Sequence, residues 1–129
     1  MKKILLSLLL LITLNLIAET APADTSVTVK PQITFLEFGS TTCVPCKMME
    51  DVLEEVRTIY NDSVDVIFHN VNEKRELSKK WGIKLIPTQI FLDAEGKEFH
   101  RHQGYYPTEE IVKVFAEQGL AKPETEIKE

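Results

Sequence analysis

The sequence is poor in cysteine, in basic charge and in glycine, and each shortage excludes a class of protein. Two cysteines among 129 residues permit only one intrachain bridge, so a disulfide-rich scaffold is excluded. The formal net charge of −5 lacks the basic excess of a nucleic-acid binder, and we expect no nucleic-acid partner. Five glycines are too few for a collagen-like chain, and 43% hydrophobic residues are too many for a disordered one. Length and composition therefore favour one globular domain.

Long apolar runs are also lacking, except at the N-terminus. There Lys2 and Lys3 precede residues 4–18, which are almost entirely apolar. A basic start followed by an apolar run of this length predicts a secretory signal peptide over residues 1–18. The run is short for a membrane span, which needs about 20 apolar residues, and an uncleaved anchor formed by residues 4–18 is the alternative. We therefore expect a periplasmic or other extracytoplasmic location.

Composition divides the remaining chain into three parts. Residues 19–31 contain Pro22 and small polar residues, which is typical of a tether. Residues 32–120 carry the regular hydrophobic patterns of a folded domain. Residues 121–129 are charged and contain Pro123, so we expect a flexible tail.

Hydrophobic periodicity predicts alternating strands and helices within that domain. In chain order, we expect a strand at 33–38, a helix from Pro45 to Tyr60, a strand at 64–71, a short helix at 73–81, strands at 88–92 and 97–103, and a helix at 108–118. The order β-α-β-α-β-β-α predicts an α/β fold. Its first two strands should be parallel, because a helix joins them, and its last two strands should form an antiparallel hairpin. Helices then flank a central mixed sheet.

Both cysteines lie at the predicted start of the first helix, as Cys43-Val44-Pro45-Cys46. Unpaired N–H groups and the helix dipole stabilise a thiolate at this position, and the thiolate is the species that attacks disulfides. We therefore assign Cys43 as the nucleophile and Cys46 as the thiol that resolves the mixed disulfide. A structural disulfide, a zinc site, and a copper site completed by a histidine or Met48 are the alternatives.

The sequence resembles the thioredoxin family over residues 32–120. The resemblance rests on Cys43-Val44-Pro45-Cys46-Lys47 after a buried strand, and on Ile86-Pro87-Thr88 about forty residues later. It implies the thioredoxin fold and a redox role for Cys43 and Cys46. It also implies that Pro87 is the family's cis-proline, which faces the cysteines and holds a substrate backbone in extended form. By the same resemblance, Gly104 lies beside the substrate groove.

Glu37 matches the family's buried acid, which accepts a proton from the resolving cysteine. Strand alternation agrees, because Glu37 shares a face with Phe35 that a helix should cover. A buried carboxyl group without a charge partner has a raised pKa and can take up a proton near neutral pH. A solvated glutamate at the edge of the sheet is the alternative.

The sequence departs from the thioredoxin pattern at three positions near these residues. Thr42 replaces the tryptophan that precedes the first cysteine, which removes an apolar docking surface, and Val44 replaces a glycine. Phe68 occupies the position of a lysine that often partners the buried acid. We place Thr42 in the substrate-binding groove together with Ile86, which should line it.

These observations predict an exported thiol–disulfide oxidoreductase that reduces protein disulfides. A reductase outside the cytosol needs electrons from across the membrane, so we expect a membrane thiol–disulfide transporter as its donor. Disulfide-containing proteins are its expected substrates, and we expect a monomer without a cofactor or metal. A disulfide-forming oxidase or isomerase, a non-catalytic binding module on the same fold and a copper carrier are the alternatives.

Overall fold

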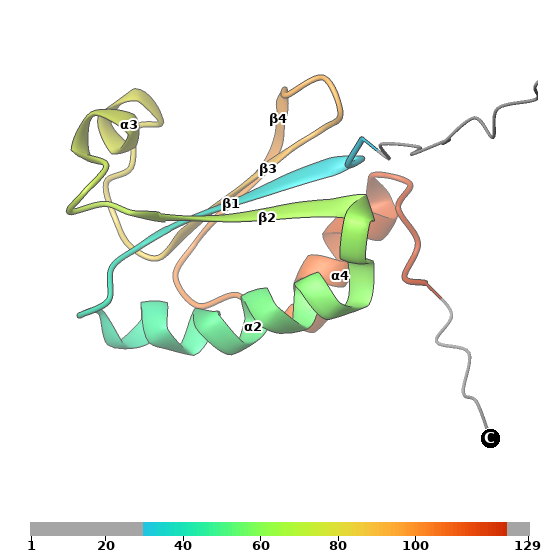
Figure 1. The fold of residues 1–129 in the computed structure, drawn as a ribbon, viewed down its shortest axis with the longest axis horizontal. Coiled ribbons are helices and arrows are strands. Elements are labelled where there is room, and N and C mark those ends of the chain that lie inside the picture. Colours follow the sequence, from blue (N-terminus) through green and yellow to red (C-terminus); the bar gives the residue numbers. More distant parts are fainter. Residues whose placement is uncertain (1–29, 124–129) are drawn as a thin grey trace, which may run out of the picture.

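The structure, a computed structural model, describes residues 30–123 (Figure 1). The elements are β1 (Ile33–Gly39), α2 (Val44–Tyr60), the 3-10 turn η1 (Asn61–Ser63), β2 (Val64–Asn70), α3 (Arg75–Lys80), β3 (Thr88–Leu92), β4 (Glu98–Gln103) and α4 (Thr108–Glu117). The predicted signal peptide, most of the tether and the end of the predicted tail lie outside the described residues. No helix within residues 30–123 is long and apolar enough to cross a membrane.

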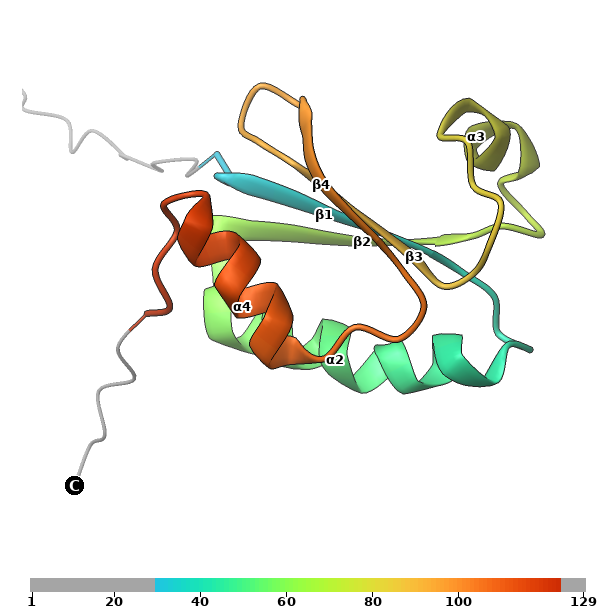
Figure 2. The same ribbon diagram turned by 180° about the vertical axis from the view of Figure 1, so that it is seen from behind.

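The four strands form one mixed sheet in the order β2-β1-β3-β4. β1 pairs with β2 in parallel, whereas the β1–β3 and β3–β4 pairs are antiparallel. Helices α2 and α4 cover one face of the sheet and α3 lies on the other (Figures 1 and 2). The predicted α/β fold with a central mixed sheet flanked by helices is therefore confirmed.

Side-chain alternation along β1 divides the core between the two faces. Phe35 points toward α2 and α4, where its ring stacks on Phe91 with centroids 4.6 Å apart and meets Phe115 edge-on. Leu36 and Phe38 point the other way, into a smaller cluster packed beneath α3. Because β1 is buried on both faces, its side chains are held rigidly, and Glu37 is held with them.

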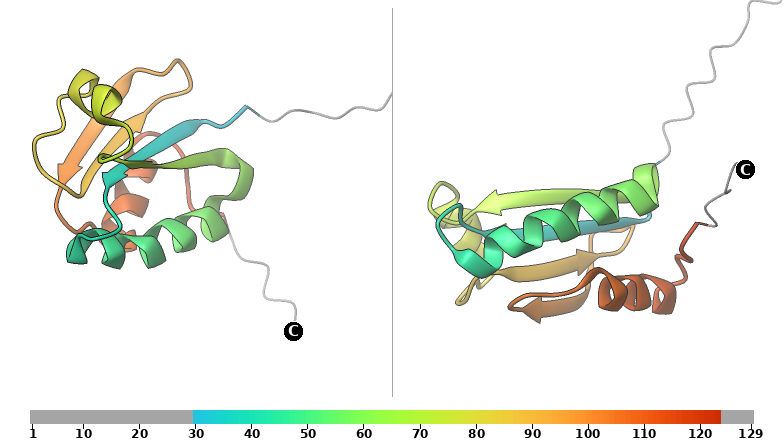
Figure 3. Two further views of the ribbon diagram at one scale, coloured as in Figure 1. Left: turned by 60° about the vertical axis from the view of Figure 1, so that its left-hand side comes forward. Right: turned by 90° about the horizontal axis from the view of Figure 1, so that it is seen from below.

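Helix α2 forms where the sequence predicts it and lies along the sheet (Figure 3). Its apolar face recurs every three or four residues and packs in the larger core. The members of that face are Met49, Val52, Leu53, Val56 and Tyr60. The helix ends at Asn61, whose φ of 44° is incompatible with a further helical turn.

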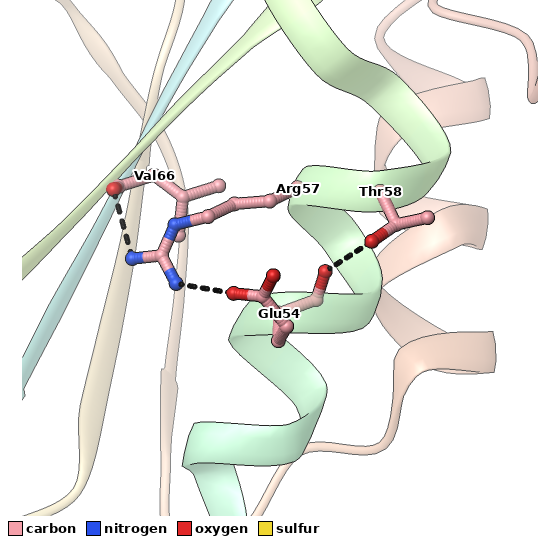
Figure 4. Close-up of polar contacts among 4 residues, drawn as sticks. All are labelled: Glu54, Arg57, Thr58 and Val66. Carbon is pink, nitrogen blue, oxygen red and sulfur yellow. Dashed lines mark hydrogen bonds and ion pairs between the residues drawn. The ribbon is translucent and has the colours of Figure 1, made fainter.

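Arg57 ties this helix to the exposed edge of the sheet (Figure 4). Its Nη2 donates to the carbonyl oxygen of Val66 on the edge strand β2 at 3.2 Å, and its Nη1 lies 3.5 Å from Glu54 Oε2. Edge strands present unpaired backbone groups to solvent, and this contact satisfies one of them.

Candidate active site

Cys43 and Cys46 are joined by a disulfide at the start of α2, with their Cα atoms 5.2 Å apart. Cys43 is the N-cap residue, and its Sγ accepts a hydrogen bond from the Cys46 backbone N–H at 3.3 Å. Cys43 is half-buried, whereas Cys46 is only 3% exposed. A substrate can therefore reach the Cys43 sulfur, and the helix N-terminus stabilises that sulfur as a thiolate.

The turn before Cys43 is fixed by its own side chains. Ser40 is buried, and its carbonyl oxygen accepts from the Cys43 N–H at 3.3 Å. Its hydroxyl accepts from the Thr42 N–H at 3.3 Å and lies 3.1 Å from the Thr42 hydroxyl. The predicted groove residue Thr42 is itself exposed beside Cys43. Ser40 is a supporting residue that sequence reasoning missed, although Ser and Thr commonly stabilise turns in this way.

Gly39 allows the sulfur of Cys46 to approach the end of β1. A Cβ atom at Gly39 would lie 3.1 Å from Phe68 Cε2 and 3.3 Å from both Cβ and Sγ of Cys46. These contacts are tight, so a side chain here forces either the ring or the cysteine to move.

We predict that Gly39→Ala destabilises the oxidised protein by about 1–3 kcal/mol, the usual range for an extra methyl group in a packed core. It should also slow disulfide exchange, because Cys46 is one of the displaced groups. Urea unfolding and an exchange assay measure the two effects. Adding Phe68→Leu, which removes the ring, should restore part of the stability. An unchanged unfolding curve for Gly39→Ala would contradict the prediction that a methyl group at Gly39 crowds Phe68 and Cys46.

Glu37 is completely buried, so the solvated alternative is wrong. Neither carboxyl oxygen has a hydrogen-bond partner. In the sheet register, Glu37 lies between Phe68 of β2 and Gln89 of β3. Burial raises the pKa of Glu37 to about 8, and the neighbouring Gln89 side chain lowers it in part. The carboxyl group can therefore both hold and release a proton near neutral pH.

Pro87 and Gly104 lie together at the end of the sheet that carries the cysteines. The Ile86–Pro87 peptide bond is cis. Phe38, near the end of β1, pairs with Thr88 at the start of β3, which places Pro87 beside the turn that leads to Cys43. The Gly104 N–H donates to the Pro87 carbonyl oxygen at 2.8 Å. Ile86 is half-buried and Pro87 buried. The structure thus brings the predicted groove residues to one end of the sheet.

Apolar side chains are exposed in segments next to these residues, and sequence reasoning did not single them out as a surface. Val44 and Met48 lie on the first turns of α2, Leu85 precedes Ile86, and Tyr105 follows Gly104. Their exposed fractions are 71%, 52%, 62% and 43%, respectively. Exposed apolar groups near a reactive sulfur suit the docking of a protein substrate.

Within residues 30–123, no group of three or more His, Cys, Asp or Glu side chains is arranged to hold a metal ion. The arrangement of the cysteines suits disulfide exchange. An accessible sulfur at a helix N-terminus and a buried partner one turn along can exchange one disulfide for another. The fold and this pair together define a thiol–disulfide oxidoreductase.

Comparison with known proteins supports this assignment as a thiol–disulfide oxidoreductase. The family model of the thioredoxin-like domain matches residues 21–119. A thioredoxin of Staphylococcus aureus is 30% identical over 98 residues, which cover 76% of this chain and 93% of that protein. The chain therefore belongs to the thioredoxin-like family, as the cysteine and proline motifs predict.

Solved thioredoxin structures show the same fold. A thioredoxin of Nicotiana alata is 30% identical, with a TM-score of 0.59 over 67% of this chain and 72% of that one. Thioredoxin-2, described as a component of the protein secretion machinery of the malaria parasite, is 17% identical, with a TM-score of 0.65 over 72% of this chain and 89% of that one. Thioredoxin-like proteins act on disulfide-containing substrates.

Proposed function

We propose that this protein reduces disulfides of exported proteins and is re-reduced by a thiol–disulfide donor in the membrane. The observation that carries the reductase assignment is the pairing of a half-buried Cys43 with a buried Cys46, together with a buried carboxyl group, Glu37, on the β1 strand that leads to them. The Staphylococcus aureus relative is a thioredoxin, and the potential of thioredoxin, about −270 mV, lies at the reducing end of the range for such proteins.

The reaction begins with the protein in its dithiol form. The Cys43 thiolate attacks a substrate disulfide that lies along Pro87. The substrate S–S bond breaks, a Cys43–substrate disulfide forms, and the leaving thiolate takes a proton from water. The Cys46 thiol then gives its proton to ionised Glu37 and attacks the Cys43 sulfur. The Cys43–substrate bond breaks, the second substrate sulfur leaves as a thiolate that takes up a proton from water, and the protein keeps the Cys43–Cys46 disulfide. Two electrons pass from protein to substrate.

The proposed location rests on the N-terminal sequence. The proposed membrane donor rests on the need to re-reduce the protein in that location. Residues 1–18 have the pattern of a secretory signal, with an uncleaved anchor as the alternative. Extracytoplasmic compartments are oxidising, so a reductase there cannot be recharged by a cytosolic thiol pool. A membrane protein that passes electrons between thiol pairs fulfils this requirement.

Reduction of insulin by dithiothreitol tests the activity, and the reduction potential tests its direction. We expect the wild type to accelerate insulin reduction and to have a potential near that of thioredoxin, about −270 mV. A potential near about −120 mV, where strong disulfide oxidants lie, would contradict the proposed direction. The absence of exchange activity would favour a binding module.

We predict that Cys46→Ser accumulates covalent complexes with substrates. Without the resolving thiol, the Cys43–substrate disulfide persists and can be isolated from an extracytoplasmic extract. Non-reducing gels and mass spectrometry then identify the partners. A membrane donor trapped by this variant would support the proposed electron route. Complexes that form equally well with Cys43→Ser would contradict the assignment of the nucleophile.

A further inference from the structure

Gln89 is an unusual residue for the middle of a buried strand. Every residue of β3 is buried, and Gln89 is completely so. The hydroxyl of its polar neighbour Thr88 donates to the Leu85 carbonyl oxygen at 2.7 Å. The Gln89 side chain is only partly satisfied, because its Oε1 is buried without a hydrogen-bond partner. Burying an unsatisfied amide oxygen costs stability, so this residue calls for an explanation beyond packing.

The Gln89 amide lies between the buried acid and the backbone of the groove. Gln89 is directly opposite Glu37 in the β1–β3 register, so their side chains share the face toward α2. Its Nε2 donates to the Gly104 carbonyl oxygen at 3.1 Å. Gly104 in turn donates to the Pro87 carbonyl oxygen at 2.8 Å. A short chain of contacts therefore leads from Glu37 to the residues that we place against the substrate.

Among the described residues, Gln89 is the only polar residue paired directly with Glu37 in the sheet. On β2 the neighbour of Glu37 is Phe68, and the next residue, His69, packs against Phe38 on the opposite face. On β4, His102 lies beyond Gln89, stacked on the Tyr106 ring at 3.9 Å. Among the buried residues of α2, Cys46 and Tyr60 carry titratable groups, and the Tyr60 ring packs edge-on against Phe115. Helix α4 buries only Thr108 and apolar side chains.

We propose that Gln89 is a positioning residue for the proton transfer, with an amide that complements both protonation states of Glu37. Only an amide offers both an acceptor oxygen and a second N–H donor. When Glu37 is neutral, its O–H can donate to the unpartnered Gln89 Oε1. When Glu37 is ionised, the N–H that Gly104 does not use can donate to the carboxylate. The contact to Gly104 persists in both states, so the groove backbone stays fixed while the proton moves.

A hydrogen bond from Gln89 does not stabilise the neutral and the ionised forms of Glu37 equally. Hydrogen bonds to a charged acceptor are roughly twice as strong as those between neutral groups. Gln89 therefore favours ionised Glu37 overall, which agrees with its lowering of the Glu37 pKa. An apolar residue at this position would leave the acid protonated at higher pH and unable to accept the Cys46 proton.

The test is Gln89→Met, which keeps the length of the side chain and removes both polar atoms. The pKa of Glu37 is measured by ¹³C NMR of its carboxyl carbon in the oxidised protein, where no cysteine titrates. We expect an upward shift of about one pH unit, the effect of losing a hydrogen bond to a charged group. The matched control is Gln118→Met, an exposed glutamine at the end of α4. It should leave the Glu37 titration unchanged.

The kinetic part of the proposal rests on the proposed function, whereas the NMR titration does not. In the dithiol form, the pH midpoint of the resolving step should rise together with the Glu37 pKa, while the first attack by Cys43 stays unchanged. If Gln89→Met does not fold, Gln89→Asn, which withdraws the amide by one methylene, should shift the titration in the same direction. A Glu37 pKa that is unchanged or lower in the variant would overturn the proposal. A wild type without exchange activity would overturn the proposed function alone.

Discussion

Replacing Cys43 with serine is expected to abolish disulfide exchange. A serine hydroxyl stays protonated at neutral pH even at a helix N-terminus, and it cannot form a disulfide with the substrate. Removal of the nucleophile from a covalent enzyme costs on the order of 10³-fold or more. We expect insulin reduction by Cys43→Ser to fall to the rate of dithiothreitol alone.

The matched control for this variant is Cys46→Ser, which also removes the bridge. Both variants lose the Cys43–Cys46 disulfide and the stability that it confers, so a difference between them reports on chemistry. Cys46→Ser should still attack one substrate molecule and then stop. If Cys43→Ser retained turnover, or if it trapped substrate while Cys46→Ser did not, the roles would be reversed. The greater exposure of Cys43 than of Cys46 argues against that outcome.

Local features of the sequence predicted much of this site. The cysteine pair, the helix that it opens and the proline motif are contiguous in the chain, and each carries its own physical signature. Burial of Glu37 followed from alternation along one strand, because Phe35 on the same face needed a covering helix. Two residues of one strand were enough for that inference.

Features that depend on strand register were not predicted. Gln89 acquires its place only because β3 pairs with β1 in one register, which sets it opposite Glu37. Its contact to Gly104 spans 15 residues of sequence, and no local pattern indicates such a contact. The exposure of Leu85, which precedes Ile86, was not predicted for the same reason, since it depends on how the loop before Pro87 crosses the end of the sheet.

Element boundaries shifted where side chains compete with the helix. The sequence predicts a helix over 73–81, whereas α3 spans Arg75–Lys80. Asn70 explains the later start. Its Nδ2 donates to Glu73 Oε1, its Oδ1 accepts from the Asn72 N–H, and its carbonyl oxygen accepts from Glu73 and Lys74 N–H groups. These bonds hold the chain in a turn before the helix can begin.

Replacing Glu37 with glutamine should stabilise the protein above neutral pH. The pKa of Glu37 is about 8 in the folded protein and 4.5 when exposed, so the folded state binds more protons between those values. The contribution of Glu37 to wild-type stability therefore falls as pH rises from about 4.5 to about 8 and is constant above that range. Glutamine does not ionise. The variant should be more stable by about 4 kcal/mol at pH 8 and by little at pH 5.

Urea unfolding of the oxidised protein at pH 5, 6.5 and 8 measures this difference without interference from the cysteines. Burial also lowers the pKa values of His69 and His100, and these groups act in the opposite direction. Their contribution is the same in both proteins and cancels in the comparison. Glu95→Gln, at an exposed turn, is the matched control and should show no pH-dependent gain. Equal stability of Glu37→Gln and wild type at pH 8 would contradict a buried, uncompensated acid.

The same substitution should slow the second half of the reaction. Without a carboxylate to take the Cys46 proton, resolution of the mixed disulfide should slow by about 10²-fold near pH 7, the lower end of general-base effects. The first attack by Cys43 needs no such base and should keep its rate. Stopped-flow measurements on each half-reaction separate the two. Replacing a purely structural residue lowers the stability of the protein. Replacing Glu37 should instead raise the stability and slow the resolving step, which is the pattern of a residue kept for the reaction at a cost in stability.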